Sequence, residues 1–197
     1  MALSANVFLA IIAMVAALLV IGVAHECGHF IAARWLRIPV RRITFGHGPV
    51  LLRRSMGADS EFVLRVVPTG MAIGVPGRRN PDGTLRRPLG HDMTMAIAGP
   101  IVSFLLAVFL FAVARVGSLA PWLQYWLVAS ALLSATLAAA NLIPVPGLDG
   151  GHLLLLGLAR LGVQLSPQRE IQVQRVGVNL LAAGCVLILV SALFRRL

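Results

Sequence analysis

Four long stretches of this sequence contain no Asp, Glu, Lys or Arg, and they constrain the fold more than any other feature. They are residues 1–24, 93–114, 116–148 and 176–194. About 20 apolar residues in a helix, at about 1.5 Å rise each, cross the roughly 30 Å hydrocarbon core of a bilayer. Because 58% of the residues are hydrophobic and only 12% are charged, composition also argues against a water-soluble monomer. We therefore expect an integral membrane protein.

The first stretch is predicted to be a retained transmembrane helix rather than a secretory signal. It has no basic segment before its apolar run and no A-x-A cleavage site at the end of that run. Its apolar character also continues to Ala33. The sequence thus predicts one domain over residues 1–197. Its expected spans are residues 5–33, 92–115, 121–143 and 176–194.

Basic residues are concentrated in the polar segment that follows the first span. The chain has 17 basic residues, all of them Arg, and eleven lie between Arg34 and Arg87, where only three acidic residues accompany them. Arg-rich loops beside membrane spans stay on the cytoplasmic side. We interpret the net charge of +10 as a topology signal, with the loop 34–91 in the cytosol, rather than as nucleic-acid binding.

Within this loop, residues 61–67 and 71–75 are apolar and partly β-branched, and Pro68-Thr69-Gly70 separates them. This pattern predicts a short β-hairpin over about 61–75. It is too apolar for a solvated hairpin, so we expect it to be membrane-associated. The predicted fold class is an all-α polytopic membrane protein with about four transmembrane helices and this hairpin after the first.

The end of the first span carries the sequence His25-Glu26-Cys27-Gly28-His29, an H-E-x-x-H pattern. On a helix, His25 and His29 share a face and can reach one cation, and Glu26 lies beside it to act on a metal-bound water. Zinc suits this set because catalytic zinc sites use three protein ligands and one open position. Ionisable residues inside an apolar span are costly and need partners or a function.

Asp149 is the strongest candidate for a third ligand. Of the seven acidic residues, only Glu26 and Asp149 are embedded in apolar sequence. Asp149 follows Pro144 and Pro146 and precedes two glycines, a composition that interrupts a helix. A broken helix at membrane depth lines protein or water and so points to a site. Two alternatives remain open: the segment is a loop outside the membrane, or His152 replaces Asp149 as ligand or supports it from the second shell.

The predicted topology brings the two motifs to one depth. The first span runs inward and carries His29 near its inner end, and the third span returns inward and leads to Asp149. The expected site therefore lies toward the cytosolic side.

These motifs resemble the site-2 proteases, intramembrane zinc metalloproteases that cut transmembrane segments of other proteins. The resemblance rests on H-E-C-G-H at 25–29, N-L-I-P-V-P-G-L-D-G-G-H at 141–152, A-G-P at 98–100 and F-V-L-R-V-V-P-T-G-M-A at 62–72. The last segment is similar to the family's membrane-associated β-hairpin, which pairs with substrate.

The resemblance implies one Zn²⁺ per chain, with His25, His29 and Asp149 as ligands and Glu26 as catalytic acid/base. It implies that Asn141 contacts the substrate backbone. The expected partners are a transmembrane protein substrate and the lipid bilayer, with no nucleic acid, and Arg-rich, Lys-free composition suggests a bacterial inner membrane.

The chain also departs from the family pattern. Ser103 stands where A-G-P-x-x-N has Asn, and the five residues between spans two and three leave no room for a PDZ insert. No CBS domain is expected, so the sequence predicts a minimal catalytic core. Two other functions remain open, a polytopic metal-binding transporter and a non-catalytic membrane scaffold. A transporter does not need Glu26 beside the first histidine, and a scaffold would have kept the pattern by descent.

Overall fold

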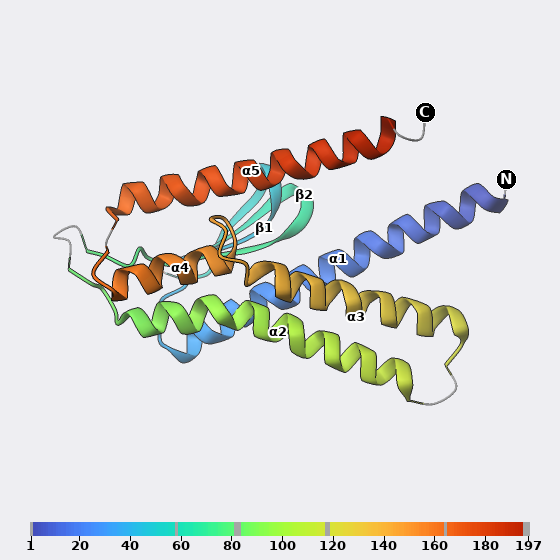
Figure 1. The fold of residues 1–197 in the computed structure, drawn as a ribbon, viewed down its shortest axis with the longest axis horizontal. Coiled ribbons are helices and arrows are strands. Elements are labelled where there is room, and N and C mark those ends of the chain that lie inside the picture. Colours follow the sequence, from blue (N-terminus) through green and yellow to red (C-terminus); the bar gives the residue numbers. More distant parts are fainter. Residues whose placement is uncertain (1, 58, 81–83, 117–118, 164, 195–197) are drawn as a thin grey trace. The chain divides into compact units, whose positions relative to one another are not determined.

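The computed structural model describes residues 2–57, 59–80, 84–116, 119–163 and 165–194. Five helices and two long strands follow one another in the order α1–β1–β2–α2–α3–α4–α5 (Figure 1). Their bounds are α1 Ala2–Trp35, β1 Arg42–Ser55, β2 Glu61–Gly74, α2 Leu89–Arg115, α3 Pro121–Asn141, α4 Asp149–Arg160 and α5 Pro167–Phe194.

The chain forms two compact units that alternate along the sequence. The first unit combines Met1–Pro76 with Ala98–Ala139, and the second combines Gly77–Ile97 with Ala140–Leu197. The first unit therefore holds α1, the strands, most of α2 and nearly all of α3. The second holds the start of α2 together with α4 and α5.

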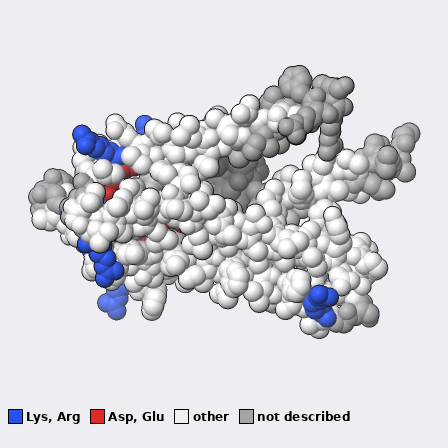
Figure 2. Space-filling view, viewed as in Figure 1, with Lys and Arg blue, Asp and Glu red and all other residues white. Residues whose placement is uncertain are grey.

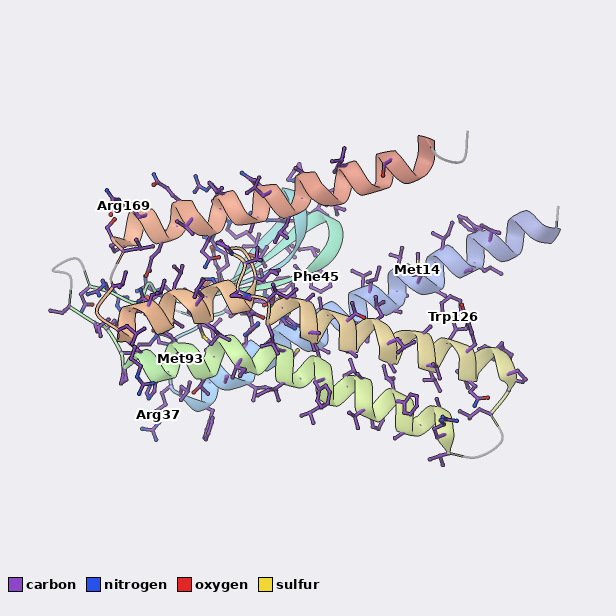
Figure 3. All side chains as sticks on the ribbon, viewed as in Figure 1. Met14, Arg37, Phe45, Met93, Trp126 and Arg169 are labelled. Carbon is purple, nitrogen blue, oxygen red and sulfur yellow. The ribbon has the colours of Figure 1, made fainter. Side chains whose placement is uncertain are left out.

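Helices α1, α2 and α3 are apolar around their whole circumference, which is typical of membrane spans rather than of helices with one buried face. The segments Val7–Trp35, Leu89–Arg115 and Pro121–Asn141 are long and apolar enough to cross a membrane. Large apolar side chains point outward, as for Phe109, which is 62% exposed. Figure 2 shows almost uncharged surfaces along these helices, and Figure 3 shows side chains such as Met14 on α1 and Trp126 on α3.

Three of the four predicted spans are confirmed as helices of suitable length and composition within the described part of the chain. The fourth, residues 176–194, lies inside α5. Several side chains near the end of α5, including Cys185, lie outside the description, so the fourth span stays a prediction. The helix bounds differ from the predicted ones by at most three residues, apart from the earlier start of α5.

The β region is larger than the sequence predicted. Residues 42–45 pair with 61–64 in parallel and with 71–74 in antiparallel register, and residues 52–55 pair with 61–64 in antiparallel register. Residues 42–45 thus lie between the two segments that were predicted to pair with each other. The prediction of a simple two-stranded hairpin was therefore wrong. The sequence analysis missed β1, because its Arg and Gly residues hide the strand pattern.

Glycines make the bend that allows β1 to pair twice. Gly46 and Gly48 have φ values of 89° and 85°, a region that residues with a Cβ rarely adopt. A Cβ on Gly46 would also press against the backbone of Val67. The bend separates residues 42–45 from 52–55, and both parts of β1 pair with residues 61–64.

Helix α3 ends at Asn141 and α4 begins at Asp149. The helix interruption predicted from Pro144 and Pro146 is therefore confirmed. The sequence analysis did not predict α4, because two glycines follow Asp149 directly and disfavour a helix in isolation.

Candidate metal centre

His25 and His29 lie one turn apart on α1, and their side chains converge. The two Nε2 atoms are 3.3 Å apart, and the ring centroids are 5.0 Å apart in an edge-to-face arrangement. His25 is a polar residue in a mostly apolar helix, and it is buried, with an exposed fraction of 6%. Two lone pairs at this distance would repel each other, so the two nitrogens must share either a proton or a cation.

The spacing of the two nitrogens fits zinc. Two nitrogen ligands at about 2.05 Å from a tetrahedral zinc ion lie about 3.3 Å from each other. The observed distance between the His25 and His29 Nε2 atoms is 3.3 Å. The pair is thus already at the separation that a shared ion requires.

Ser103 on α2 holds the other ring nitrogen of His25. Its Oγ lies 2.9 Å from His25 Nδ1, and both groups are buried. Ser134 on α3 donates from its Oγ to the backbone oxygen of Ser103 at 2.7 Å. The contact with Ser103 leaves His25 Nε2 as the nitrogen that faces His29.

Glycines allow α2 to approach α1 at this level. A Cβ on Gly28 would lie 2.9 Å from the carbonyl carbon of Ala98, and one on Gly99 would lie 2.8 Å from His25 Nε2. Close approach of helices in membranes commonly depends on small residues. Pro100 follows within the same helix and is fully buried. The A-G-P sequence therefore lies directly against the histidine pair.

Glu26 is half-buried and follows His25 directly on α1. Cys27, in a free position of the H-E-x-x-H pattern, is a half-buried free thiol. Consecutive helical residues point about 100° apart, so Glu26 lies beside the face that carries the two histidines. This placement suits a group that acts near a bound ion.

In the second unit, Asp149 is the first residue of α4 and is half-buried. The next two glycines are packed against the loop before them. A Cβ on Gly150 would overlap the backbone of Leu142, and one on Gly151 would lie 2.8 Å from the α-carbon of Pro146. The Asp-Gly-Gly sequence is therefore the packed start of a helix and differs from an exposed turn.

Helix α5 supports the loop that precedes Asp149. The side-chain oxygen of Gln174 accepts a hydrogen bond from the backbone N–H of Gly147, which has a φ of 99°. A Cβ on Gly177 would lie 2.7 Å from Cβ of Pro146. These contacts fix the backbone of the loop from the side of α5.

Asn141 is the last residue of α3 and is half-buried, whereas His152 is exposed in the first turn of α4. The exposure of His152 is more typical of a peripheral residue than of a ligand. The roles of Asn141, Asp149 and His152 remain predictions.

Residues 13–122 and 116–184 match the sequence model of peptidase family M50. The chain belongs to this family, the site-2 protease family. The regulator of sigma-E protease from Salmonella typhimurium is 31% identical over 107 residues, which are 50% of this chain and 24% of that protein. A Nostoc protein named as a candidate zinc metalloprotease is 32% identical over 118 residues, 55% of this chain and 32% of the relative.

The solved structure of the site-2 protease from Methanocaldococcus jannaschii has the same fold. It aligns with a TM-score of 0.56 and 21% sequence identity, over 98% of this chain and 76% of that one. The chain spans about a quarter to a third of the length of the two relatives above. Together with the three apolar helices, membership of the M50 family makes this an integral membrane protein.

The sequence analysis left the role of Ser103 in doubt and did not consider Ser134. The signal was present, because both are polar residues inside charge-free spans, where a hydroxyl needs a hydrogen-bond partner. The A-G-P sequence three residues before Ser103 indicated which part of α2 approaches the histidines.

Proposed function

We propose that this protein is an intramembrane zinc metalloprotease that hydrolyses peptide bonds within or near transmembrane segments of other membrane proteins. The observation that carries the proposal is the pair of Nε2 atoms of His25 and His29, 3.3 Å apart in an apolar helix of an M50 family member. The half-buried Glu26 next to the first histidine favours a hydrolase over a transporter, because ion transport needs no such residue.

The proposed zinc ligands are His25, His29 and Asp149, with one ion per chain. They offer two imidazole nitrogens and one carboxylate oxygen, a donor set that could hold one metal ion. Such a set leaves a fourth position open, as catalytic zinc sites do. We assign His152 to the periphery of the site, where it supports the ligands.

When bound, zinc would supply Lewis-acid chemistry, which polarises a carbonyl and lowers the pKa of a water toward neutrality. Glu26 accepts a proton from the attacking water and later delivers it to the nitrogen of the leaving amine. Ser103 holds the ring of His25, so the histidine keeps its orientation during both proton transfers.

Substrate binding requires an extended segment, because the backbone of a helix is occupied by its own hydrogen bonds. Residues 71–74 and 52–55 are the outer segments of the described strand pairings. An unwound substrate segment can add to such an outer segment and regain its backbone hydrogen bonds. Asn141 also contacts the substrate backbone.

The proposal includes the topology expected from the sequence. Residues 1–197 form one protease domain with four spans, in a bacterial inner membrane, and the active site lies toward the cytosol. The concentration of Arg between Arg34 and Arg87 supports this orientation.

The test uses purified full-length protein in proteoliposomes with a single-span substrate, and it measures zinc content and cleavage. Glu26→Gln should retain zinc and lose activity by at least about 10²-fold, because it removes the acid/base and no ligand. His25→Ala and Asp149→Ala should lose both zinc and cleavage.

The outcomes separate the functions. Cleavage by Glu26→Gln at the wild-type rate would rule out the protease mechanism. Zinc retention by Asp149→Ala would remove that residue from the ligand set. Zinc flux into liposomes that survives Glu26→Gln would favour a transporter.

A further inference from the structure

Ser103 on α2 makes a polar contact with the ring of His25. Ser103 is completely buried at 0% exposure, and its Oγ lies 2.9 Å from His25 Nδ1. The two residues are 78 positions apart, so the contact exists only because α2 packs against α1. Burying a hydroxyl without a hydrogen-bond partner costs free energy. The contact with His25 gives the Ser103 hydroxyl such a partner.

The Ser103 hydroxyl can accept a hydrogen bond from Nδ1–H of His25. A neutral imidazole carries one N–H donor and one acceptor nitrogen. When Nδ1–H donates to Ser103 Oγ, the lone pair is on Nε2, which is the atom that faces His29 at 3.3 Å. Metal-binding histidines usually donate their second ring N–H to a fixed acceptor, which orients the ring and sets the tautomer.

Ser134 on α3 contacts the backbone of Ser103 and not its hydroxyl. Its Oγ donates to the backbone oxygen of Ser103 at 2.7 Å, and Ser134 is also completely buried. Ser134 thus joins α3 to α2 at the residue that contacts His25. Its hydrogen bond stays on the backbone, so the side chain of Ser103 remains available to the histidine.

We propose that Ser103 is a positioning residue that holds His25 in the tautomer and ring orientation required for zinc binding. It does this where the family pattern places an Asn. The inference rests on the proposed function, since it concerns the same zinc site. Ser103 acts through His25 and contacts neither substrate nor the reacting atoms.

The experiment compares Ser103→Ala with Ser134→Ala, which removes a buried hydroxyl of the same size from the neighbouring helix contact. Zinc affinity is measured by competition with a chelator of known affinity, beside kcat, KM and the midpoint of thermal unfolding. Ser103→Ala should weaken zinc binding about tenfold or more. It should lower kcat with little change in KM, because substrate contacts remain.

Ser134→Ala should lower the unfolding midpoint and leave zinc affinity within about twofold of wild type, because it removes no contact to the histidine. Ser103→Thr keeps the hydroxyl and should recover most of the zinc affinity. If Ser103→Ala does not fold, Ser103→Cys fills a similar volume with a weak acceptor and should show the same loss of affinity.

Zinc affinity within about twofold of wild type in folded Ser103→Ala or Ser103→Cys would overturn the inference. An equal loss in Ser134→Ala would also overturn it, because the effect would then be one of packing. A wild-type protein that binds no zinc would instead contradict the proposed function. The two failures are therefore distinguishable.

Discussion

Gly99 on α2 faces the imidazole of His29 on α1 with no space for a side chain between them. A Cβ at this position would lie 2.6 Å from Cε1 of His29 and 2.8 Å from Nε2 of His25. Real Cβ atoms essentially never approach other atoms so closely, so either the imidazole rings or the backbone of α2 would have to move. Gly28 on α1 likewise has no space for a Cβ. Each of the two helices therefore contributes a glycine to the close contact.

Gly99→Ala should therefore weaken zinc binding by displacing the two imidazoles. Gly90→Ala is the matched control, because Gly90 lies on the same helix and a Cβ there meets nothing within 4 Å. We expect a loss of zinc affinity of at least about tenfold for the first variant and none for the second. Zinc content of the purified proteins measures the difference. Equal zinc content in both variants would show that the close contact is not needed.

Gly177→Ala should destabilise the segment before Asp149. A Cβ on Gly177 would lie 2.7 Å from Cβ of Pro146 and would also overlap its backbone, whereas one on Gly184 of the same helix meets nothing within 4 Å. We expect Gly177→Ala to lower the free energy of unfolding by about 1–3 kcal/mol. Gly184→Ala should be neutral or slightly stabilising. Thermal unfolding in detergent tests both, and equal midpoints would contradict the contact.

Glu170→Gln should destabilise the second unit through Arg78. The Arg78 guanidinium is only 10% exposed and forms an ion pair with Glu170. Burial lowers the pKa of Arg78, and the charge of Asp92 opposes this shift. A lowered pKa means that folding disfavours the charged form. Arginine stays protonated around neutral pH. The loss of Glu170 therefore leaves the positive charge of Arg78 poorly compensated there.

The expected cost of Glu170→Gln is about 1–2 kcal/mol, between the values for exposed and fully buried pairs. The control is Arg169→Gln at the exposed neighbouring position, labelled in Figure 3, which should change stability by less than about 0.5 kcal/mol. Unfolding midpoints are compared at two salt concentrations. A larger effect for Arg169→Gln would show that the ion pair contributes little.

Removal of zinc should inactivate the protein reversibly and lower its unfolding midpoint. A ligand that binds only the folded state stabilises it by about 2.7 kcal/mol when its concentration is 100 times Kd. The decrease on chelation should be smaller in His25→Ala, which lacks one proposed ligand. Cleavage should return when zinc is added back and should not return with magnesium, which prefers oxygen ligands. An unfolding midpoint that a chelator leaves unchanged in wild type would contradict a structural contribution from the ion.

The sequence by itself determined the features that depend on local spacing. His25 and His29 share a helix face because they are four residues apart, and the charge-free stretches determine where the helices of the first unit run. The break between α3 and α4 follows from Pro144 and Pro146, which cannot continue a regular helix. Each of these properties is set by residues that are close along the chain.

Only the tertiary structure decided which distant residues meet. The contact of Ser103 with His25 spans 78 positions. Residues 42–45 and 52–55 pair with the same residues 61–64, on either side of a bend at two glycines. Helix α4 forms although glycines follow its first residue, because these glycines pack against the preceding loop. Packing selects one arrangement from the many that local preferences allow, since contact energies between distant segments exceed the small differences in local propensity.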